Sequence, residues 1–182
     1  ADDSFDWTDG FQGRGQFWIA QQRGDAADNG FEGDNLSSDR DAQPRSAPVL
    51  YNVTLIGDPD TNEGTASDDG MVLREGTAGN FYNFIVLGFK ETGVSVRDRS
   101  QDFVGNILTV THTITHGNGQ GDYEDDGGVF LNDPTNSGAD PEIADPYNLS
   151  APNFMPAASG PARNGAVPVA APPNDGFFEA AD

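Results

Sequence analysis

A six-residue segment in which apolar and polar side chains alternate recurs four times along this chain. It occupies residues 4–9, 30–35, 70–75 and 93–98, at spacings of 26, 40 and 23 residues. Alternation with a period of two predicts a short β-strand that has one buried side and one mostly polar side. Recurrence at such spacings predicts a repeat architecture, in which each unit buries its apolar side against the next unit.

The columns of this repeat predict which side chains form the core. The buried set takes the second and fourth positions of each segment: Phe5, Trp7, Phe31, Met71, Leu73, Val94 and Val96. The outward set comes from the third and fifth positions: Asp6, Thr8, Glu32, Asp34, Arg74 and Arg97. Equivalent strands of stacked units lie about 4.8 Å apart. We therefore expect Asp34 to meet Arg74 in a cross-strand ion pair worth ~0.2–1 kcal/mol.

A second, longer strand is predicted in three of the units. It covers residues 16–22, 50–56 and 81–87. A fourth candidate lies within residues 106–116, where the pattern does not fix the register. Two inserts, residues 36–45 and 57–69, should leave the stack as loops, because the other units close without them.

Two strands per unit, joined by glycine-containing bends, fit one coil of a parallel β-helix. The consensus of leucine-rich repeats, which have similar periods, is absent, and amphipathic helical stretches are rare. We expect an all-β fold, with about four β-helix coils in residues 1–117. Residues 118–182 should form an acidic Gly/Pro-rich loop and an extended tail packed on the β-helix.

The tail differs from the repeats in composition. Nine of the twelve prolines follow Asn132, and residues 151–174 are rich in Pro, Ala and Gly. A segment of this kind cannot build a core of its own. We expect it to lie along the β-helix, anchored by four apolar side chains: Phe154, Met155, Val167 and Val169.

Several long motifs carry a family resemblance. They are DDSFDWTDG at residues 2–10, GQFW at 15–18, PRSAP at 44–48, DGMVLREGTAGN at 69–80 and FFE at 177–179. Together they resemble a family of secreted right-handed parallel β-helix proteins, mostly uncharacterised surface proteins or lipoproteins of Gram-negative bacteria. The resemblance implies a right-handed β-helix and an extracellular, cell-surface or periplasmic location. It assigns no catalytic residues.

The same resemblance implies that the chain is a piece of a longer protein. Family members have a secretion signal and further coils before the first of these motifs. The strand expected at residues 3–9 should therefore contact protein outside residues 1–182, either missing coils of the parent chain or another subunit. An open strand edge at that place would otherwise favour aggregation.

Charge limits the classes of partner. Thirty acidic and nine basic residues give a formal net charge of −21, so nucleic acid and anionic membrane surfaces would repel the chain. No run of 18 apolar residues that would span a bilayer occurs. The absence of cysteine excludes disulfides and thiolate metal sites.

Carboxylates and loop carbonyls are the donors that Ca²⁺ prefers. The densest acidic cluster follows the glycine-rich residues 117–121 and predicts a Ca²⁺ site made of Asp122, Glu124, Asp125 and Asp126. Two further clusters lie within residues 58–69 and 25–34. None of the three matches an EF-hand loop or a nine-residue calcium roll, and a solvated acidic surface is the competing interpretation.

The two histidines do not predict a metal site. His112 and His116 have a chelating spacing only if they lie on a helix. Their β-branched neighbours place them on a strand, where four residues span about 13 Å. We therefore expect structural or surface roles for both. Motifs for a nucleophile elbow, a Walker loop, a dinucleotide site or a zinc peptidase are absent as well.

Two classes of function remain. The first is a non-catalytic structural or binding module of an exported bacterial surface protein, within a larger assembly. The second is a carbohydrate-active β-helix enzyme, similar to a polysaccharide lyase or a glycosidase. Its chemistry would use the outward ladder and the following turn: Asp6, Glu32, Asp34, Arg74, Asp9 and Glu75. Stacked charges arise automatically in an acid-rich repeat, so we favour the first class.

The consecutive aromatics Phe17 and Trp18 offer a further interaction surface, because one of two neighbours on a strand points outward. An outward Trp18 near Arg14 and Gln22 would suit stacking on a surface glycan or a contact with protein. The interpretation that we favour instead packs Trp18 beneath the insert at residues 36–45.

Overall fold

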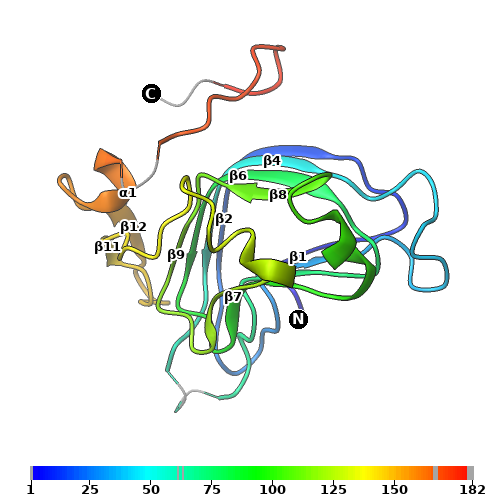
Figure 1. The fold of residues 1–182 in the computed structure, drawn as a ribbon. Coiled ribbons are helices and arrows are strands. Elements are labelled where there is room, and N and C mark those ends of the chain that lie inside the picture. The colour runs from blue at the N-terminus through cyan, green and yellow to red at the C-terminus, as the bar shows by residue number, and fades with distance from the viewer. Residues whose placement is uncertain (1, 61, 63, 166–167, 180–182) are drawn as a thin grey trace.

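The computed structural model describes residues 2–60, 62, 64–165 and 168–179, and the side chain of Asp126 lies outside this description (Figure 1). Five strands belong to a first sheet, called sheet A: β1 Phe5–Trp7, β3 Phe31–Gly33, β5 Met71–Leu73, β7 Thr92–Val96 and β10 Gly121–Glu124. Five strands belong to a second sheet, called sheet B: β2 Arg14–Gln21, β4 Val49–Ile56, β6 Gly79–Leu87, β8 Leu108–Thr111 and β9 Ile114–His116. The remaining elements are short: β11 Ile143–Asp145, β12 Asn153–Pro156, the 3₁₀ helices Asp98–Phe103 and Asp126–Gly128, and α1 Pro161–Asn164.

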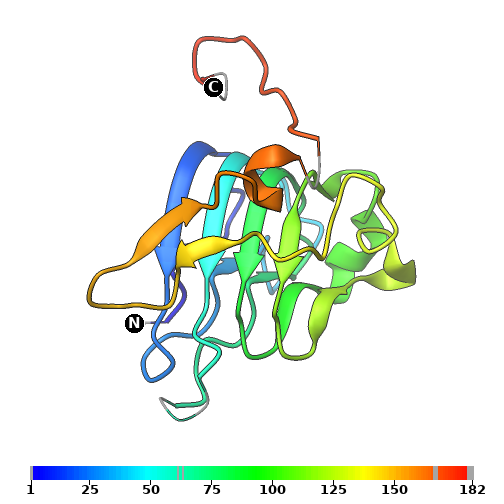
Figure 2. The ribbon, with the colours of Figure 1, turned by 90° about the vertical axis from the view of Figure 1, so that its left-hand side faces the viewer.

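The two sheets are stacks of parallel strands, one strand of each sheet per coil. Sheet A has the order β1-β3-β5-β7-β10, and sheet B has the order β2-β4-β6-β8, with β9 also paired to β6. Figure 2 shows the long strands side by side in chain order, with β11 and β12 crossing in front of them. The predicted all-β fold, a parallel β-helix of about four coils, is confirmed.

The register of sheet A follows the predicted columns. Phe31 pairs with Phe5 on one side and with Met71 on the other, and Met71 pairs with Val94. The predicted core residues are buried, except that Phe5 is half-buried while it packs against the core. The periodicity therefore identified both the strands and their inward faces.

The outward face of sheet A departs from the simple alternation in its later coils. Val72 and Ser95 occupy the outward column, yet both are buried. Arg97 donates to the Ser95 hydroxyl (Nε to Oγ, 3.1 Å) and to Asp69 (Nη2 to Oδ2, 2.6 Å), so its guanidinium spans this part of the face. A long charged side chain lying along the sheet covers the positions between its two partners.

Sheet B has the predicted gapless alignment of β4 with β6, from Leu50 opposite Phe81 to Ile56 opposite Leu87. The uncertain fourth strand is resolved into β8 and β9, which both pair with β6. The strands bend at one position per coil, where residues in register adopt a positive φ: Phe17, Asn52, Asn83 and His112. Asparagine tolerates this conformation, and the Asn83 amide also donates to Asn52 (Nδ2 to Oδ1, 2.8 Å).

Both predicted inserts are loops among the described residues; Thr61 and Glu63 of the second insert lie outside the description. Part of the predicted tail anchoring is wrong. Met155 and Val169 are 61% and 65% exposed, whereas Val167 lies outside the described residues. Phe178 is buried instead, at 7% exposure, and makes an edge-to-face contact with Tyr51 (ring centroids 4.8 Å apart).

The division into residues 1–117 and 118–182 stays a prediction. The structure adds that stacking continues beyond residue 117, because β10 pairs with β7. Within the described part of the chain, no helix has both the length and the apolar character needed to cross a membrane.

Candidate functional site

The outward face of sheet A brings charged side chains of successive coils together. Arg74, which directly follows β5, donates to Glu32 (Nη2 to Oε1) and to Asp34 (Nε to Oδ1, 3.0 Å). Both carboxyl groups belong to the preceding coil. The predicted ion pair between Asp34 and Arg74 is thus present, and Glu32 joins it. This group of side chains, with Asp6 in register with Glu32, is called the sheet A ladder below.

Two carboxyl groups of the sheet A ladder have raised pKa values. The pKa of Glu32 is raised to about 7: burial is the largest cause, Arg74 opposes it, and the neighbouring Asp3, Asp34 and Asp6 add to the rise. The pKa of Asp6 is raised too, first by burial and then by Asp3 and Asp34. Glu32 is therefore a carboxyl group that holds a proton close to neutral pH beside other carboxylates.

A second charged group lies one coil further on. Asp69, whose side chain is almost fully buried, accepts hydrogen bonds from Arg97 (2.6 Å) and from the backbone N–H of Thr92 (2.8 Å). Burial raises the pKa of Asp69 to about 6, against the lowering by these two donors. Ser95 connects this group to the last strand by donating to Glu124 (Oγ to Oε2, 2.8 Å). The hydrogen-bond partners of Asp69, Arg97 and Ser95 thus all belong to the stacked coils.

A ladder that the sequence analysis missed fixes the turns before the sheet A strands. Asp3 accepts from the backbone N–H of Asn29 (2.8 Å), Asn29 accepts from Asp69 (3.3 Å), and Asp69 accepts from Thr92. The signal was present, because Asn29, Asp69 and Thr92 each precede a glycine at the same point of the repeat. A Cβ at the following Gly30 or Gly70 would lie 2.4 Å from a carbonyl oxygen of the next coil. Only glycine fits this close approach.

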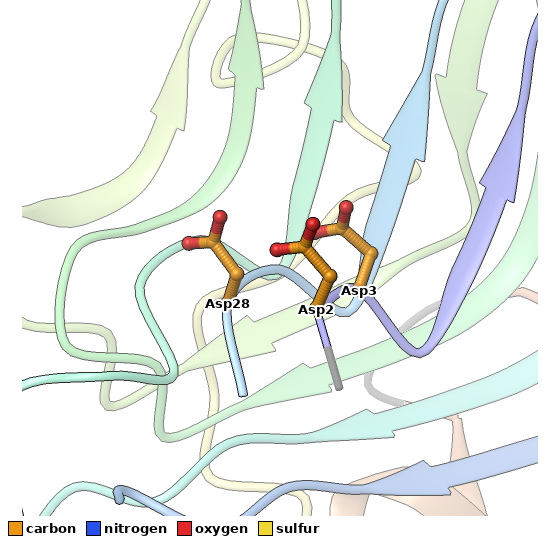
Figure 3. A group of neighbouring side chains, drawn as sticks. All are labelled: Asp2, Asp3 and Asp28. Carbon is orange, nitrogen blue, oxygen red and sulfur yellow. The ribbon is translucent and has the colours of Figure 1, made fainter. Parts of the chain in front are cut away.

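Three carboxylates meet at the start of this ladder. Asp2, Asp3 and Asp28 each place one oxygen within 4.8 Å of the others, as Figure 3 shows. Asp28 came from the weaker acidic cluster of residues 25–34, and the other two were not predicted as ligands. Burial, with Asp3 and Asp68 next, raises the pKa of Asp28. The group is acidic and partly exposed, and such groups are common without a bound ion.

The predicted Ca²⁺ residues of the later acidic cluster have separate partners. Asp122 lies near the Asn118 amide (3.5 Å), Glu124 accepts from Ser95, and Asp125 accepts from the backbone N–H of Phe130 (3.1 Å). The side chain of Asp126 is outside the described part of the chain. Calcium binding by Asp122, Glu124, Asp125 and Asp126 stays a prediction.

The histidines lie on sheet B, as expected from the β-branched pattern. The strand breaks between β8 and β9 at His112, whose Nδ1 lies 3.1 Å from the Thr111 hydroxyl. Nδ1 of His116 lies 3.0 Å from the carbonyl oxygen of Gly138. Each ring is thus oriented by its own local contact.

The placement of Trp18 differs from the favoured prediction. Its ring stacks on Phe5 (5.0 Å between centroids) and lies 6.2 Å from Phe31, so it belongs to the first coil's core rather than to the 36–45 insert. Phe17 and Ile19 point outward instead, with exposed fractions of 55% and 52%. The positive φ at Phe17 rotates the strand at this point, and a simple two-residue alternation does not include such a bend.

Open grooves lie beside sheet B rather than over the sheet A ladder. One, of about 290 Å³, is lined by Phe17, Trp18, Ile19, Asn52, Thr54, Asn83 and Ile85. A larger one, of about 550 Å³, lies between the second insert and the loop after β11, and is lined by Asp58, Pro59, Asp60, Tyr147, Asn148, Leu149 and Ser150. The described grooves and the charge cluster therefore occupy different faces.

Comparison with known proteins gives the family. No curated protein and no solved structure matches the chain. A family model described as a pectate-lyase-like beta helix domain matches residues 1–126, which is more than half of the 182 residues. The stacked coils agree with that description, and the chain belongs to the pectate-lyase-like beta helix family.

Proposed function

We propose that this chain is a non-catalytic structural or binding module of an exported bacterial surface protein, and that it docks through its first coil onto a further parallel coil supplied by protein outside residues 1–182. The observation that carries the proposal is the surface of the first coil. β1 and β2 are the end strands of their sheets, and Phe5 and Trp18 are half-buried, whereas their partners Phe31 and Val53 are buried.

The chemistry of this surface favours another coil over other occupants. Two end strands of one coil offer unpaired backbone donors and acceptors with the spacing of a parallel β-helix. Covering the two half-buried aromatics would contribute roughly 25 cal/mol for each Å² of apolar surface removed from water. The net charge of −21 disfavours an anionic membrane or nucleic acid at the same place.

Hydrogen exchange tests the docking directly. In the isolated chain, the amides of β1 and β2 that do not donate to β3 or β4 should exchange fast, while those of β4 and β6 stay protected by pairing on both sides. In a longer protein that supplies the further coil, we expect these amides to exchange at least about 100-fold more slowly, as paired core strands do. Equal exchange rates of β1 and β2 in the two proteins would refute the docking.

A carbohydrate-active enzyme is the second candidate, and the sheet A ladder supports it. Glycosidases use one carboxyl group that keeps its proton and one that is ionised. Glu32, with a pKa of about 7, meets the first of these two requirements. Arg74 binds both Glu32 and Asp34, and the grooves described above lie elsewhere, so the binding module is the better-supported function.

An activity screen separates the two functions. The chain is incubated with acidic and neutral polysaccharides in the presence of Ca²⁺, and new reducing ends and unsaturated sugars are measured. We expect no turnover above a sample without protein. Turnover that disappears in the Glu32→Gln variant but persists in Glu124→Gln would replace the binding-module proposal with the enzyme.

A further inference from the structure

The outward face of sheet B carries two carboxamide side chains that hold the main chain of the tail. Asn83 donates to the carbonyl of Ala170 (Nδ2 to O, 2.9 Å) and accepts from the same residue's N–H (2.7 Å). Gln16 does the same with Glu179: it donates to the carbonyl and accepts from the N–H, both at 2.7 Å. Each amide thus satisfies both backbone groups of one residue, as a neighbouring strand would.

Side chains between these two anchors add an aromatic slot. Phe178 is buried against Tyr51, which stacks on Tyr82 (ring centroids 4.6 Å apart). Arg14 lies over the rings of Phe177 and Phe178 (4.5 and 4.6 Å to the centroids). Arg14 also forms an ion pair with Asp175. The slot therefore selects a segment with an aromatic side chain and a nearby carboxylate.

The tail is attached at two separate points and arches between them. Asn83 lies on β6 and Gln16 on β2, so the anchors are two strand spacings, or about 10 Å, apart. Glu179 follows Ala170 by nine positions, and an extended chain of that length would reach about 30 Å. Figures 1 and 2 show the tail running away from the sheets and turning back. Among residues 168–179, Phe178 is the one classed as buried.

We propose that the outward face of sheet B is a peptide-binding site for residues 168–179, which the chain's own tail occupies in cis and the same segment of a second copy occupies in trans. The contacts are to main-chain atoms, to one buried ring and to the half-exposed Arg14, so the local free energy that holds the tail is small compared with that of the coils. A tail from a second copy makes identical contacts, which is the basis of segment exchange between identical chains. This site shares β2 with the docking surface of the first coil, but it uses outward side chains of that strand rather than its backbone edge. Hydrogen exchange therefore tests the docking and peptide binding tests this site, and either can fail without the other.

Binding of a labelled peptide to the full chain tests the proposed site. The probe is a fluorescent peptide with the sequence of residues 168–179, followed by anisotropy. In the wild-type chain the tail competes in cis, so binding should be weak. Phe178→Ala weakens the competitor, and we expect this variant to bind the peptide about tenfold more tightly, because the binding-competent fraction increases. Val169→Ala changes an exposed side chain and should match the wild type.

Further variants and a scrambled peptide separate the site from unspecific adhesion. Adding Gln16→Ala to Phe178→Ala removes one amide anchor and should weaken peptide binding about tenfold. The scrambled peptide should bind no variant. If Phe178→Ala binds the peptide no more tightly than the wild type does, or if Gln16→Ala leaves the affinity unchanged, the peptide site is refuted. Thermal unfolding curves recorded alongside show whether each variant is folded.

Exchange between copies is tested with donor and acceptor dyes. The chain has no cysteine, so Ser38→Cys in an exposed loop allows one label per molecule. Energy transfer in a mixture of the two labelled chains should rise with concentration and disappear when excess peptide is added. Peptide binding without energy transfer at millimolar chain concentration would refute the second copy as the occupant.

Discussion

The two outward faces of this β-helix use different chemistry to deal with exposed strands. On sheet A, charged side chains of successive coils pair with each other, with Arg74 and Arg97 as the cations. On sheet B, neutral amides and aromatic rings predominate, and they hold the tail. The comparison teaches that one face pairs its charged side chains within the stack, whereas the other face keeps groups able to bind added polypeptide.

Removing the central cation of sheet A should have the largest effect. Arg74→Met leaves Glu32 and Asp34 without their shared partner, in a row that also contains Asp6. We expect a loss of about 2 kcal/mol in the free energy of unfolding, measured by urea denaturation, because partly buried charges lose their compensation. The matched control is Arg23→Met, whose ion pair with Asp25 is exposed and should matter by less than about 0.5 kcal/mol. Equal effects of the two substitutions would remove the distinction between the ladder and an ordinary surface pair.

Disrupting the amide ladder of sheet B should have the next largest effect. Asn83→Ala removes the hydrogen bonds to Asn52 and Ala170 and leaves a β-carbon at φ 59° without the local hydrogen bonds of the asparagine side chain. We expect a loss of about 1–2 kcal/mol. Asn83→Gly loses the same hydrogen bonds, but glycine adopts a positive φ without backbone strain. This variant should therefore be less destabilised than Asn83→Ala by about 1 kcal/mol. Identical stabilities of the two variants would show that the bend does not depend on backbone strain.

Calcium should stabilise the acidic parts of the chain by a smaller amount. If a site with a dissociation constant near 1 mM forms, 10 mM Ca²⁺ contributes about 1.4 kcal/mol. Thermal unfolding with Ca²⁺ and with chelator measures it. Loss of the increment in Asp122→Asn would assign the site to the predicted cluster, and loss in Asp28→Asn would assign it to the carboxylate group of Figure 3. Identical melting temperatures with Ca²⁺ and with chelator would leave the solvated acidic surface as the interpretation.

We also expect a pH dependence of stability that originates on sheet A. The pKa of Glu32 in the folded protein is about 7, above its ordinary value of 4.5, so the folded state holds a proton that the unfolded chain has released in this interval. Its contribution to stability is full below pH 4.5 and is lost as the pH rises through 7. Asp69 has the same sign between pH 3.8 and about 6.

Denaturant unfolding at several pH values tests this sign. Stability should fall from pH 5 to pH 8 in the wild type, and Glu32→Gln should flatten the upper part of the curve. Asp145→Asn, on an exposed strand, provides the control and should leave the curve unchanged. A Glu32→Gln curve parallel to that of the wild type would mean that folding does not raise the pKa of Glu32.

Part of the candidate site could be predicted from the equivalent positions of the sequence repeat, and part could not. The pair Asp34 and Arg74 follows from stacking, because equivalent positions of adjacent coils must lie side by side. The bond from Arg97 to Asp69 does not follow, since it joins the end of one strand to the turn before another. The three carboxylates of Asp2, Asp3 and Asp28 also meet through turns, whose path the alternation does not encode.

The sequence by itself determined the repeat, the inward columns and the parallel stacking, because a period of two and a recurring spacing leave one way to bury the apolar side chains. Only the tertiary structure decided the orientation of Trp18, the partners of Arg74 and Arg97, and the anchoring of the tail by Phe178. The physical reason is the range of the forces involved. The alternation of apolar and polar residues involves every residue of a strand and can be read from the local sequence. The conformation at a single bend, the contacts of a long arginine side chain and the burial of one ring depend instead on segments that are distant in the sequence.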